Sequence, residues 1–226
     1  MQPRLTLTLM SAAAVLALRL ATPANATITN GNAGQLTSND GTLEATFLYV
    51  SAADESTLTL PLAGTTINFL AGGNPSLPAG VLFDNKLSAI GDTYSVTGLS
   101  AGQMLPFTLN NITAGLTYVA GLPYSNTPQP GSRTGVYHFA YLSEATYVSN
   151  FGPIAGAAAT NMTAIAALNT WTYVAIEDLN LDGSDDWNDL VFAFHDVSPP
   201  SVPEPAALAV LGFGLLGLGL IRRRRT

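Results

Sequence analysis

Between residues 27 and 198 the chain consists of short runs rich in β-branched and aromatic residues, separated by turn-forming Gly, Pro and Asn. We expect eight strands, at residues 43–50, 65–70, 93–99, 104–109, 117–122, 134–142, 171–176 and 190–195. Many short strands with frequent turns are typical of β-sandwiches and barrels. The pattern predicts an all-β fold, with one β-sandwich or jelly-roll-like domain over residues 27–198.

Two segments next to these strands have a different composition. Residues 155–168 are rich in alanine, with Met162, Ile165 and Leu168 at loosely helical spacing, which indicates one short helix or a loop of small residues. Residues 199–205 are rich in proline, which continues neither a strand nor a helix. We therefore interpret them as a spacer that ends the domain.

The N-terminus has the three parts of a secretory signal peptide. Arg4 precedes a mostly apolar run over residues 5–18, and Ala24-Asn25-Ala26 supplies the small residues that a signal peptidase requires. We predict that residues 1–26 are a signal peptide cleaved after Ala26. Arg19 lies between the apolar run and the cleavage site, where charge is unusual, so a retained N-terminal anchor is the alternative.

The composition of residues 27–198 excludes several kinds of site. Two basic residues, Lys86 and Arg133, stand against fourteen acidic ones. Nucleic acid is excluded as a partner, because binding phosphates requires clustered cations. The chain has no cysteine, which removes disulfides, thiolate zinc sites and a cysteine nucleophile.

The acidic segment 178–189 has the spacing of a calcium-binding loop. Counted from Asp178, oxygen-bearing side chains occupy positions 1, 3, 5, 9 and 12; these are Asp178, Asn180, Asp182, Asp186 and Asp189. Gly183 is at position 6, where the loop turns sharply, and Ser184 at position 7 is expected to offer its backbone carbonyl. Alternate residues of a tight loop point their oxygens inward, and calcium takes six to eight oxygens. We therefore expect Ca²⁺ here, the alternative being a solvated acidic turn.

The flanking residues are strand-like rather than helical, so the expected role is a structural site and not an opening sensor.

The stretch from Trp171 to His195 resembles a domain of unknown function in exported bacterial proteins, the 4114 family. That resemblance implies a β-rich calcium-loop domain without established activity. It also allows a second ligand set, in which Glu177 and Asn188 join Asp178, Asp186 and Asp189.

The C-terminal tail combines a proline-rich motif, an apolar segment and a basic cluster. Pro203-Glu204-Pro205 precedes apolar residues 206–221, which we interpret as a transmembrane helix, and Arg222, Arg223, Arg224 and Arg225 begin a basic cytoplasmic tail, residues 222–226. Arginines at this end favour an orientation with the domain outside the cytoplasm.

This order of elements closely resembles the PEP-CTERM sorting signal. The resemblance implies transient anchoring in the inner membrane and processing by an exosortase, a membrane-embedded protease, in bacteria that make exopolysaccharide or biofilm. The protein would then reach the cell surface or the extracellular matrix. A plain C-terminal anchor is the alternative.

No nucleophile elbow, zinc-protease motif or phosphate-binding loop occurs in the sequence. His138 and His195 lie in strand-like segments, where packed or surface roles are expected. We therefore expect no enzyme but a calcium-stabilised surface or matrix module. It would bind exopolysaccharide through Tyr137, Tyr141 or Trp171, unless these are core residues. The alternative is an extracellular hydrolase acting on matrix polysaccharide.

Overall fold

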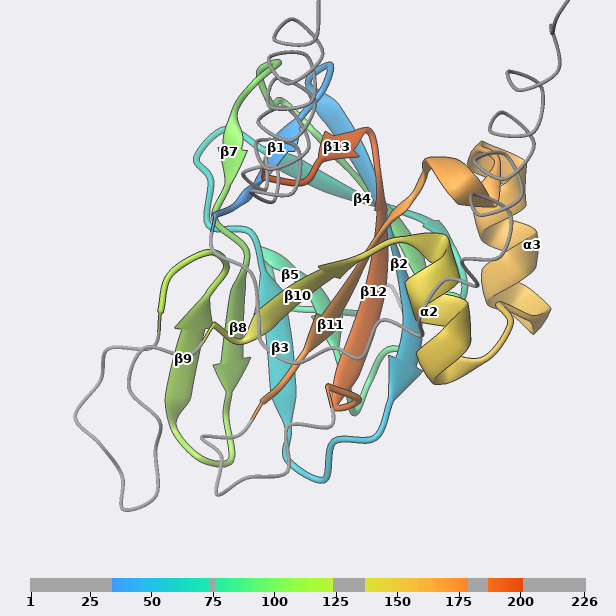
Figure 1. The fold of residues 1–226 in the computed structure, drawn as a ribbon. Coiled ribbons are helices and arrows are strands. Elements are labelled where there is room, and N and C mark those ends of the chain that lie inside the picture. Colours follow the sequence, from blue (N-terminus) through green and yellow to red (C-terminus); the bar gives the residue numbers. More distant parts are fainter. Residues whose placement is uncertain (1–33, 74–75, 124–136, 179–186, 201–226) are drawn as a thin grey trace, which may run out of the picture.

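In the computed structural model, which describes residues 34–73, 76–123, 137–178 and 187–200, antiparallel strands form three sheets (Figure 1). The largest sheet has six strands. Their order is β10 (Phe139–Leu142), β11 (Thr172–Ile176), β12 (Leu190–His195), β2 (Thr42–Val50), β6 (Thr93–Thr97) and β4 (Thr66–Ala71). β12 and β2, which are far apart in sequence, therefore pair at the centre of this sheet.

The other two sheets are smaller. One has the order β5 (Val81–Asp84), β3 (Ser56–Thr59), β8 (Thr108–Asn111) and β9 (Leu116–Val119). The third has the order β13 (Val197–Ser198), β1 (Leu36–Ser38) and β7 (Met104–Leu105). Because β13 follows β12 after a single residue, the β1–β13 pair lies at the end of β12 that is remote from Leu190.

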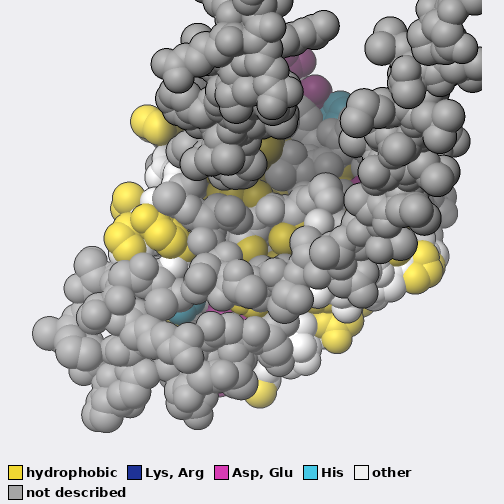
Figure 2. Space-filling model, in the orientation of Figure 1, with side chains coloured by type: hydrophobic (Ala, Val, Ile, Leu, Met, Phe, Trp, Pro, Cys, Tyr) yellow, Lys and Arg dark blue, Asp and Glu magenta, His cyan; other side chains and the backbone are white. Residues whose placement is uncertain are grey.

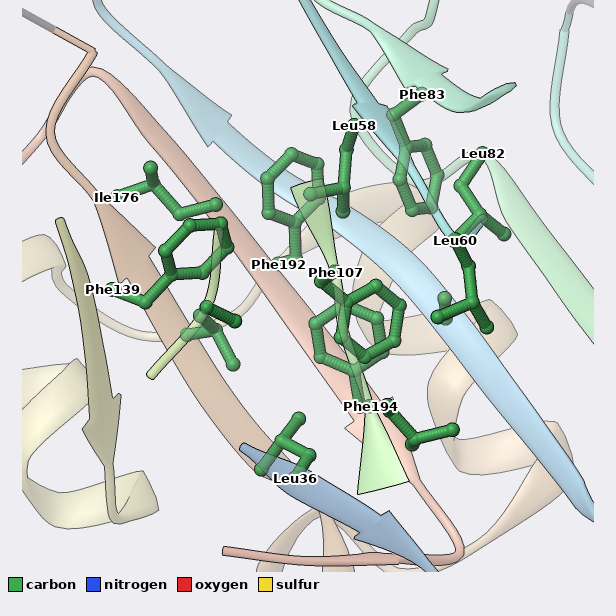
Figure 3. Close-up of a cluster of buried hydrophobic side chains, with 14 of the residues drawn as sticks. Leu36, Leu58, Leu60, Leu82, Phe83, Phe107, Phe139, Ile176, Phe192 and Phe194 are labelled. Atoms are coloured by element: carbon green, nitrogen blue, oxygen red, sulfur yellow. The ribbon is translucent and has the colours of Figure 1, made fainter. Parts of the chain in front are cut away.

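The main hydrophobic core lies between the six-stranded and four-stranded sheets, which face each other across it (Figure 3). Phe192 of β12 lies at its centre, with ring centroids 5.3 Å from Phe47 and 5.0 Å from Phe83. Phe107 and Phe194 extend this cluster, with centroids 4.5 Å apart. Removing this much apolar surface from water is the main favourable term holding the two sheets together.

The opposite face of the six-stranded sheet is covered by α2 (Glu144–Phe151) and α3 (Gly156–Ile165), followed by the short 3₁₀ helix η1 (Leu168–Thr170) (Figure 1). Met162 of α3 and Tyr147 of α2 pack in one buried cluster with Tyr173 of β11. Strand residues alternate between the two cores, since Phe192 and Phe194 face one and Val191 and Ala193 the other.

Local sequence explains where α2 begins and ends. The hydroxyl of Ser143 accepts a hydrogen bond from the backbone N–H of Thr146 at 3.2 Å, and Glu144 lies in the first turn. Both features stabilise a helix N-terminus. The C-cap is Gly152, whose φ of 85° is readily adopted by glycine.

α3 is joined to the sheet through Gly91, at the turn before β6. Gly91 has φ of 97°, and a Cβ added there would lie 2.8 Å from the Cβ of Ala157. Its carbonyl accepts a hydrogen bond from Nδ2 of Asn161 at 2.8 Å. A side chain at position 91 would therefore push α3 away from the sheet.

The prediction of a mainly β domain built from antiparallel strands is confirmed. The expected strand at 104–109 is instead two strands, β7 and β8, and the helix expected within 155–168 is α3 followed by η1. α2 and the short strands β1, β3, β5 and β13 were not predicted.

The predicted signal peptide and the tail from Ser201 onward lie outside the described residues. Within the part of the chain that is described, no helix is long and apolar enough to cross a membrane.

Candidate metal centre

Three carboxylates meet at the edge of the six-stranded sheet where β11 ends and β12 begins. Glu177 and Asp178 follow β11, and Asp189 precedes β12. Because Ile176 pairs with Leu190, the residues beyond this pair are held at the same edge. One oxygen from each of the three side chains lies within 4.8 Å of the others. Oxygens bound to one calcium ion at about 2.3–2.6 Å can be up to about 5 Å apart, so the cluster fits a shared cation.

Asp178 is a buried carboxylate in this cluster. The residue is 1% exposed, and its Oδ2 accepts a hydrogen bond from the hydroxyl of Ser56 at 3.0 Å. Its backbone N–H donates to Oδ2 of Asp189 at 2.8 Å. A buried carboxylate is costly unless it is paired or bound to a metal. The position of Asp178 therefore favours a cation as its partner.

The four-stranded sheet completes the site from the opposite side. Asn111, at the end of β8, donates from Nδ2 to Oδ2 of Asp54 and to the backbone carbonyl of Asp178, both at 2.9 Å. Asp54, which precedes β3, brings a fourth carboxyl group into this network. The cluster thus connects the two facing sheets at one end of the domain.

The charges around Asp178 oppose its ionisation. Burial, followed by the negative charge of Asp189, raises the pKa of Asp178 to about 7. Lys86 is the one Lys or Arg among the described residues, and its Nζ donates to the backbone carbonyls of Ala52 at 3.3 Å and Ala53 at 2.8 Å. Figure 2 likewise shows no Lys or Arg colouring on the described part of its face.

Glu177 is held in place by its backbone. Its N–H donates to the carbonyl of His138 at 3.2 Å, and Nδ1 of His138 lies 2.9 Å from the carbonyl of Glu177. Since a carbonyl only accepts, His138 donates from Nδ1. The imidazole also stacks on Tyr118, with ring centroids 3.9 Å apart. His138 therefore has the packed role expected from its strand-like position.

Trp187 closes this side of the cluster. It is 1% exposed, and its backbone N–H donates to Oε2 of Glu177 at 3.4 Å. Its φ of 53° is uncommon for a bulky residue. This turn of the backbone brings the chain back toward β12 immediately before Asp189.

The structure brings together part of each predicted ligand set. Asp178 and Asp189, the first and last positions of the predicted loop, lie together, and Glu177 of the second set lies with them. Asn188 is described and adjoins Asp189. The other predicted ligands lie outside the described residues; these are Asn180, Asp182, Ser184 and Asp186. Both ligand sets, the loop positions and the set with Glu177 and Asn188, therefore stay predictions.

The residues that the four-stranded sheet contributes to the cluster were not predicted. Ser56 and Asn111 are 122 and 67 residues away from Asp178 in the chain. A polar residue at a strand end is also what an ordinary turn contains, so no local signal marks these two residues. Only the pairing of the strands brings them to Asp178.

Of the three aromatic residues proposed for polysaccharide binding, Trp171 is buried, and Tyr137 and Tyr141 are half-buried. Trp171 is 4% exposed and belongs to the core beneath the helices. Tyr141 is half-buried, and its hydroxyl donates to the carbonyl of Gly34 at 2.9 Å. Burial raises the pKa of Tyr141 well above its usual range. Trp171 thus has the core role that was the alternative to ligand binding.

The C-terminal tail follows Pro200, the last described residue. Residues 201–225 match the PEP-CTERM protein-sorting motif. This match supports the resemblance of the tail, and it indicates an exported protein that is transiently anchored in a membrane and processed by an exosortase, a membrane protease. Comparisons with curated proteins and with solved structures find no match.

The matched residues include Pro203, Glu204 and Pro205, and the four arginines Arg222, Arg223, Arg224 and Arg225. All of them lie outside the described residues, as does the predicted apolar helix.

Proposed function

We propose that this protein is an exported, exosortase-processed component of the cell surface or extracellular matrix, with a β-sandwich domain stabilised by calcium. The domain acts as a non-catalytic module associated with exopolysaccharide or biofilm. The observation that carries the calcium proposal is the convergence of Glu177, Asp178 and Asp189 around one point.

The chemistry of the donor set supports calcium over a softer metal. The cluster offers carboxylate oxygens, which suit Ca²⁺ and Mg²⁺. Ser56 and Asp54, which belong to the same hydrogen-bond network, also carry oxygen atoms. Calcium tolerates irregular geometry and a large ligand number, which a site assembled from two sheets and a loop can supply. Its binding would compensate the buried charge of Asp178.

The placement of the carboxylates also supports a non-catalytic role. A glycosidase needs two carboxyl groups facing a sugar across a cleft. Here Glu177, Asp178 and Asp189 surround a single point, and Asp178 is fully enclosed. His138, which could otherwise act as a proton carrier, is buried against Tyr118.

Thermal unfolding of the full-length chain in detergent, with excess calcium and with a chelator, tests the calcium proposal. An ion that binds only the folded protein at a hundred times its Kd stabilises it by about 2.7 kcal/mol. We expect a clear rise in melting temperature with calcium that is lost in Asp178→Asn and Asp182→Ala. Glu44→Gln, which removes a carboxylate at the other end of β12, is the matched control and should keep the shift. Equal melting temperatures of the wild-type protein in calcium and chelator would refute the site.

A further inference from the structure

A separate group of metal-ligating side chains lies at the end of β12 remote from Asp189. His195 is the last residue of β12 and pairs directly with Glu44 of β2. Asp196 follows it. One ligand atom from each of these three residues lies within 4.8 Å of the others. The cluster is therefore built on two paired central strands, which hold two of its side chains in fixed register.

The distances within this cluster match the spacing of ligands around a small tetrahedral ion. Nδ1 of His195 lies 3.1 Å from Oε2 of Glu44 and 3.4 Å from Oδ2 of Asp196. Zinc bonds of about 2.0–2.1 Å arranged tetrahedrally separate neighbouring ligand atoms by about 3.3–3.4 Å. These two separations are therefore compatible with a shared ion, and the carboxylate oxygens of Glu44 and Asp196 lie within 4.8 Å of each other.

The backbone directs Asp196 toward His195. Its φ of 57° ends β12, instead of continuing the strand. Its carbonyl accepts a hydrogen bond from the backbone N–H of Asn39 at 2.9 Å. β13 then pairs with β1, so Asp196 is fixed on both sides. The imidazole is supported as well, since the rings of Trp171 and His195 have centroids 5.3 Å apart.

Charge and exposure suit a divalent ion that keeps contact with solvent. The side chains of His195, Glu44 and Asp196 are 18%, 19% and 35% exposed, which leaves room for a water molecule as a further ligand. With a neutral imidazole the cluster carries two negative charges. Lys86, the single described Lys or Arg, bonds to Ala52 and Ala53 beyond the opposite end of β2.

We propose that Glu44, His195 and Asp196 form a binding site for a divalent transition-metal ion of the zinc type. One imidazole nitrogen and two carboxylate oxygens are a ligand set that zinc accepts and that differs from the oxygen donors calcium prefers. The competing interpretation is an ion pair, in which a protonated His195 donates from Nδ1 to the carboxylates. The metal requires the same nitrogen without its proton, so the two states exclude each other.

Calorimetric titration of the untagged full-length chain with Zn²⁺, in detergent and saturating Ca²⁺, tests this proposal. We expect the affinity to weaken at least tenfold in His195→Ala and Glu44→Gln, as for loss of a ligand, and to persist in Asp178→Asn, which alters the other cluster. Absence of zinc binding by the wild-type chain would leave only the ion pair. Undiminished binding in His195→Ala would also overturn the proposal, as would loss in Asp178→Asn alone.

A measurement on the wild-type chain keeps the proposal testable if a variant fails to fold. The chain contains two histidines, His138 and His195, so ¹⁵N-histidine labelling gives the ring-nitrogen signals of only two imidazoles. Zinc should shift the signals of His195 and leave those of the buried His138 in place. Unchanged signals of His195 at saturating zinc would show that its nitrogen does not bind the metal.

Discussion

The backbone N–H of Asp178 donates to the Oδ2 of Asp189 at 2.8 Å, so the first and last residues of the 178–189 segment are hydrogen-bonded to each other. The carbonyl of Asp189 in turn accepts from the backbone N–H groups of Ser51 at 3.0 Å and Ala52 at 3.2 Å. Both ends of the segment are thus fixed to the sheet by contacts among described residues. The fold therefore already holds the two carboxylates together, and a cation would only have to neutralise their charge.

We expect Asp178→Asn to stabilise the protein in the presence of a chelator. An amide keeps the shape of the side chain and can still accept from Ser56, but it removes a buried negative charge beside Asp189. Chemical denaturation in chelator should show a higher midpoint for Asp178→Asn than for the wild type. In calcium the order should reverse, because only the wild type gains stability from the ion. A variant less stable than the wild type in both conditions would contradict this account.

The pH dependence of stability should reveal the same carboxyl group. Burial and Asp189 raise the pKa of Asp178 from 3.8 to about 7. The folded state then keeps a proton that the unfolded chain has lost, so in chelator the free energy of unfolding should decrease as pH rises from about 4 to about 7. Calcium binds the deprotonated form and should reverse this trend.

Urea denaturation across this pH range, with Asp178→Asn as the reference, isolates the contribution of Asp178. The difference between wild type and variant in chelator should grow with pH. A difference that stays constant from pH 4 to pH 7 would show that folding does not raise the pKa of Asp178.

Asn111 is expected to be a major polar contact between the two sheets. The residue is 1% exposed and donates to Asp54 and to the carbonyl of Asp178. Asn111→Ala leaves the buried carbonyl of Asp178 and the half-buried carboxyl group of Asp54 without that donor, at a cost of about 1–3 kcal/mol. Asn110→Ala, one position earlier on the opposite face of β8, is the matched control and should change stability by less than about 0.5 kcal/mol. Equal effects of the two substitutions, measured by denaturation, would contradict the special role of Asn111.

The fold was predictable wherever short-range patterns carry the information. The run 43–50 was recognisable as a strand from its β-branched and aromatic residues, and it forms β2. α2 was missed, although Ser143 and Glu144 are an N-terminal helix signal immediately after the strand predicted for residues 134–142. β3 and β5 are only four residues each, too short to show an alternating pattern clearly.

The two candidate metal clusters differ in how far the sequence predicts them. Asp178 and Asp189 lie within one short segment, so a spacing rule found them, whereas Glu177 was implied only by the family resemblance. Glu44 and His195 are 151 residues apart, and only the pairing of β2 with β12 makes them neighbours. Isolated charged residues in separate strands carry no local signal of a shared ligand.

The sorting motif should control release from the membrane without affecting the domain. Replacing Pro203, Glu204 and Pro205 by alanine removes the residues that resemble the processing signal, while the described domain ends before them, at Pro200. In the native bacterium we expect the variant to accumulate uncleaved in the membrane fraction, whereas the wild type is processed. Replacing Thr226, which follows the matched residues 201–225, by alanine is a control for general changes in the tail. Processing of the motif variant at the wild-type rate would show that these three residues are not required.

Phe192 is the residue whose truncation should damage the domain most. It is fully buried, and its ring lies between those of Phe47 and Phe83 at the centre of the core between the sheets. Phe192→Ala removes these contacts and leaves a cavity, with an expected cost of about 3–5 kcal/mol. Leu70→Ala, at a residue that is 49% exposed, should cost far less. If calcium binds only the folded protein, as proposed, it should raise the melting temperature of Phe192→Ala by as much as that of the wild type. Loss of the calcium shift in a folded Phe192→Ala variant would mean instead that the core and the carboxylate cluster are coupled through β12.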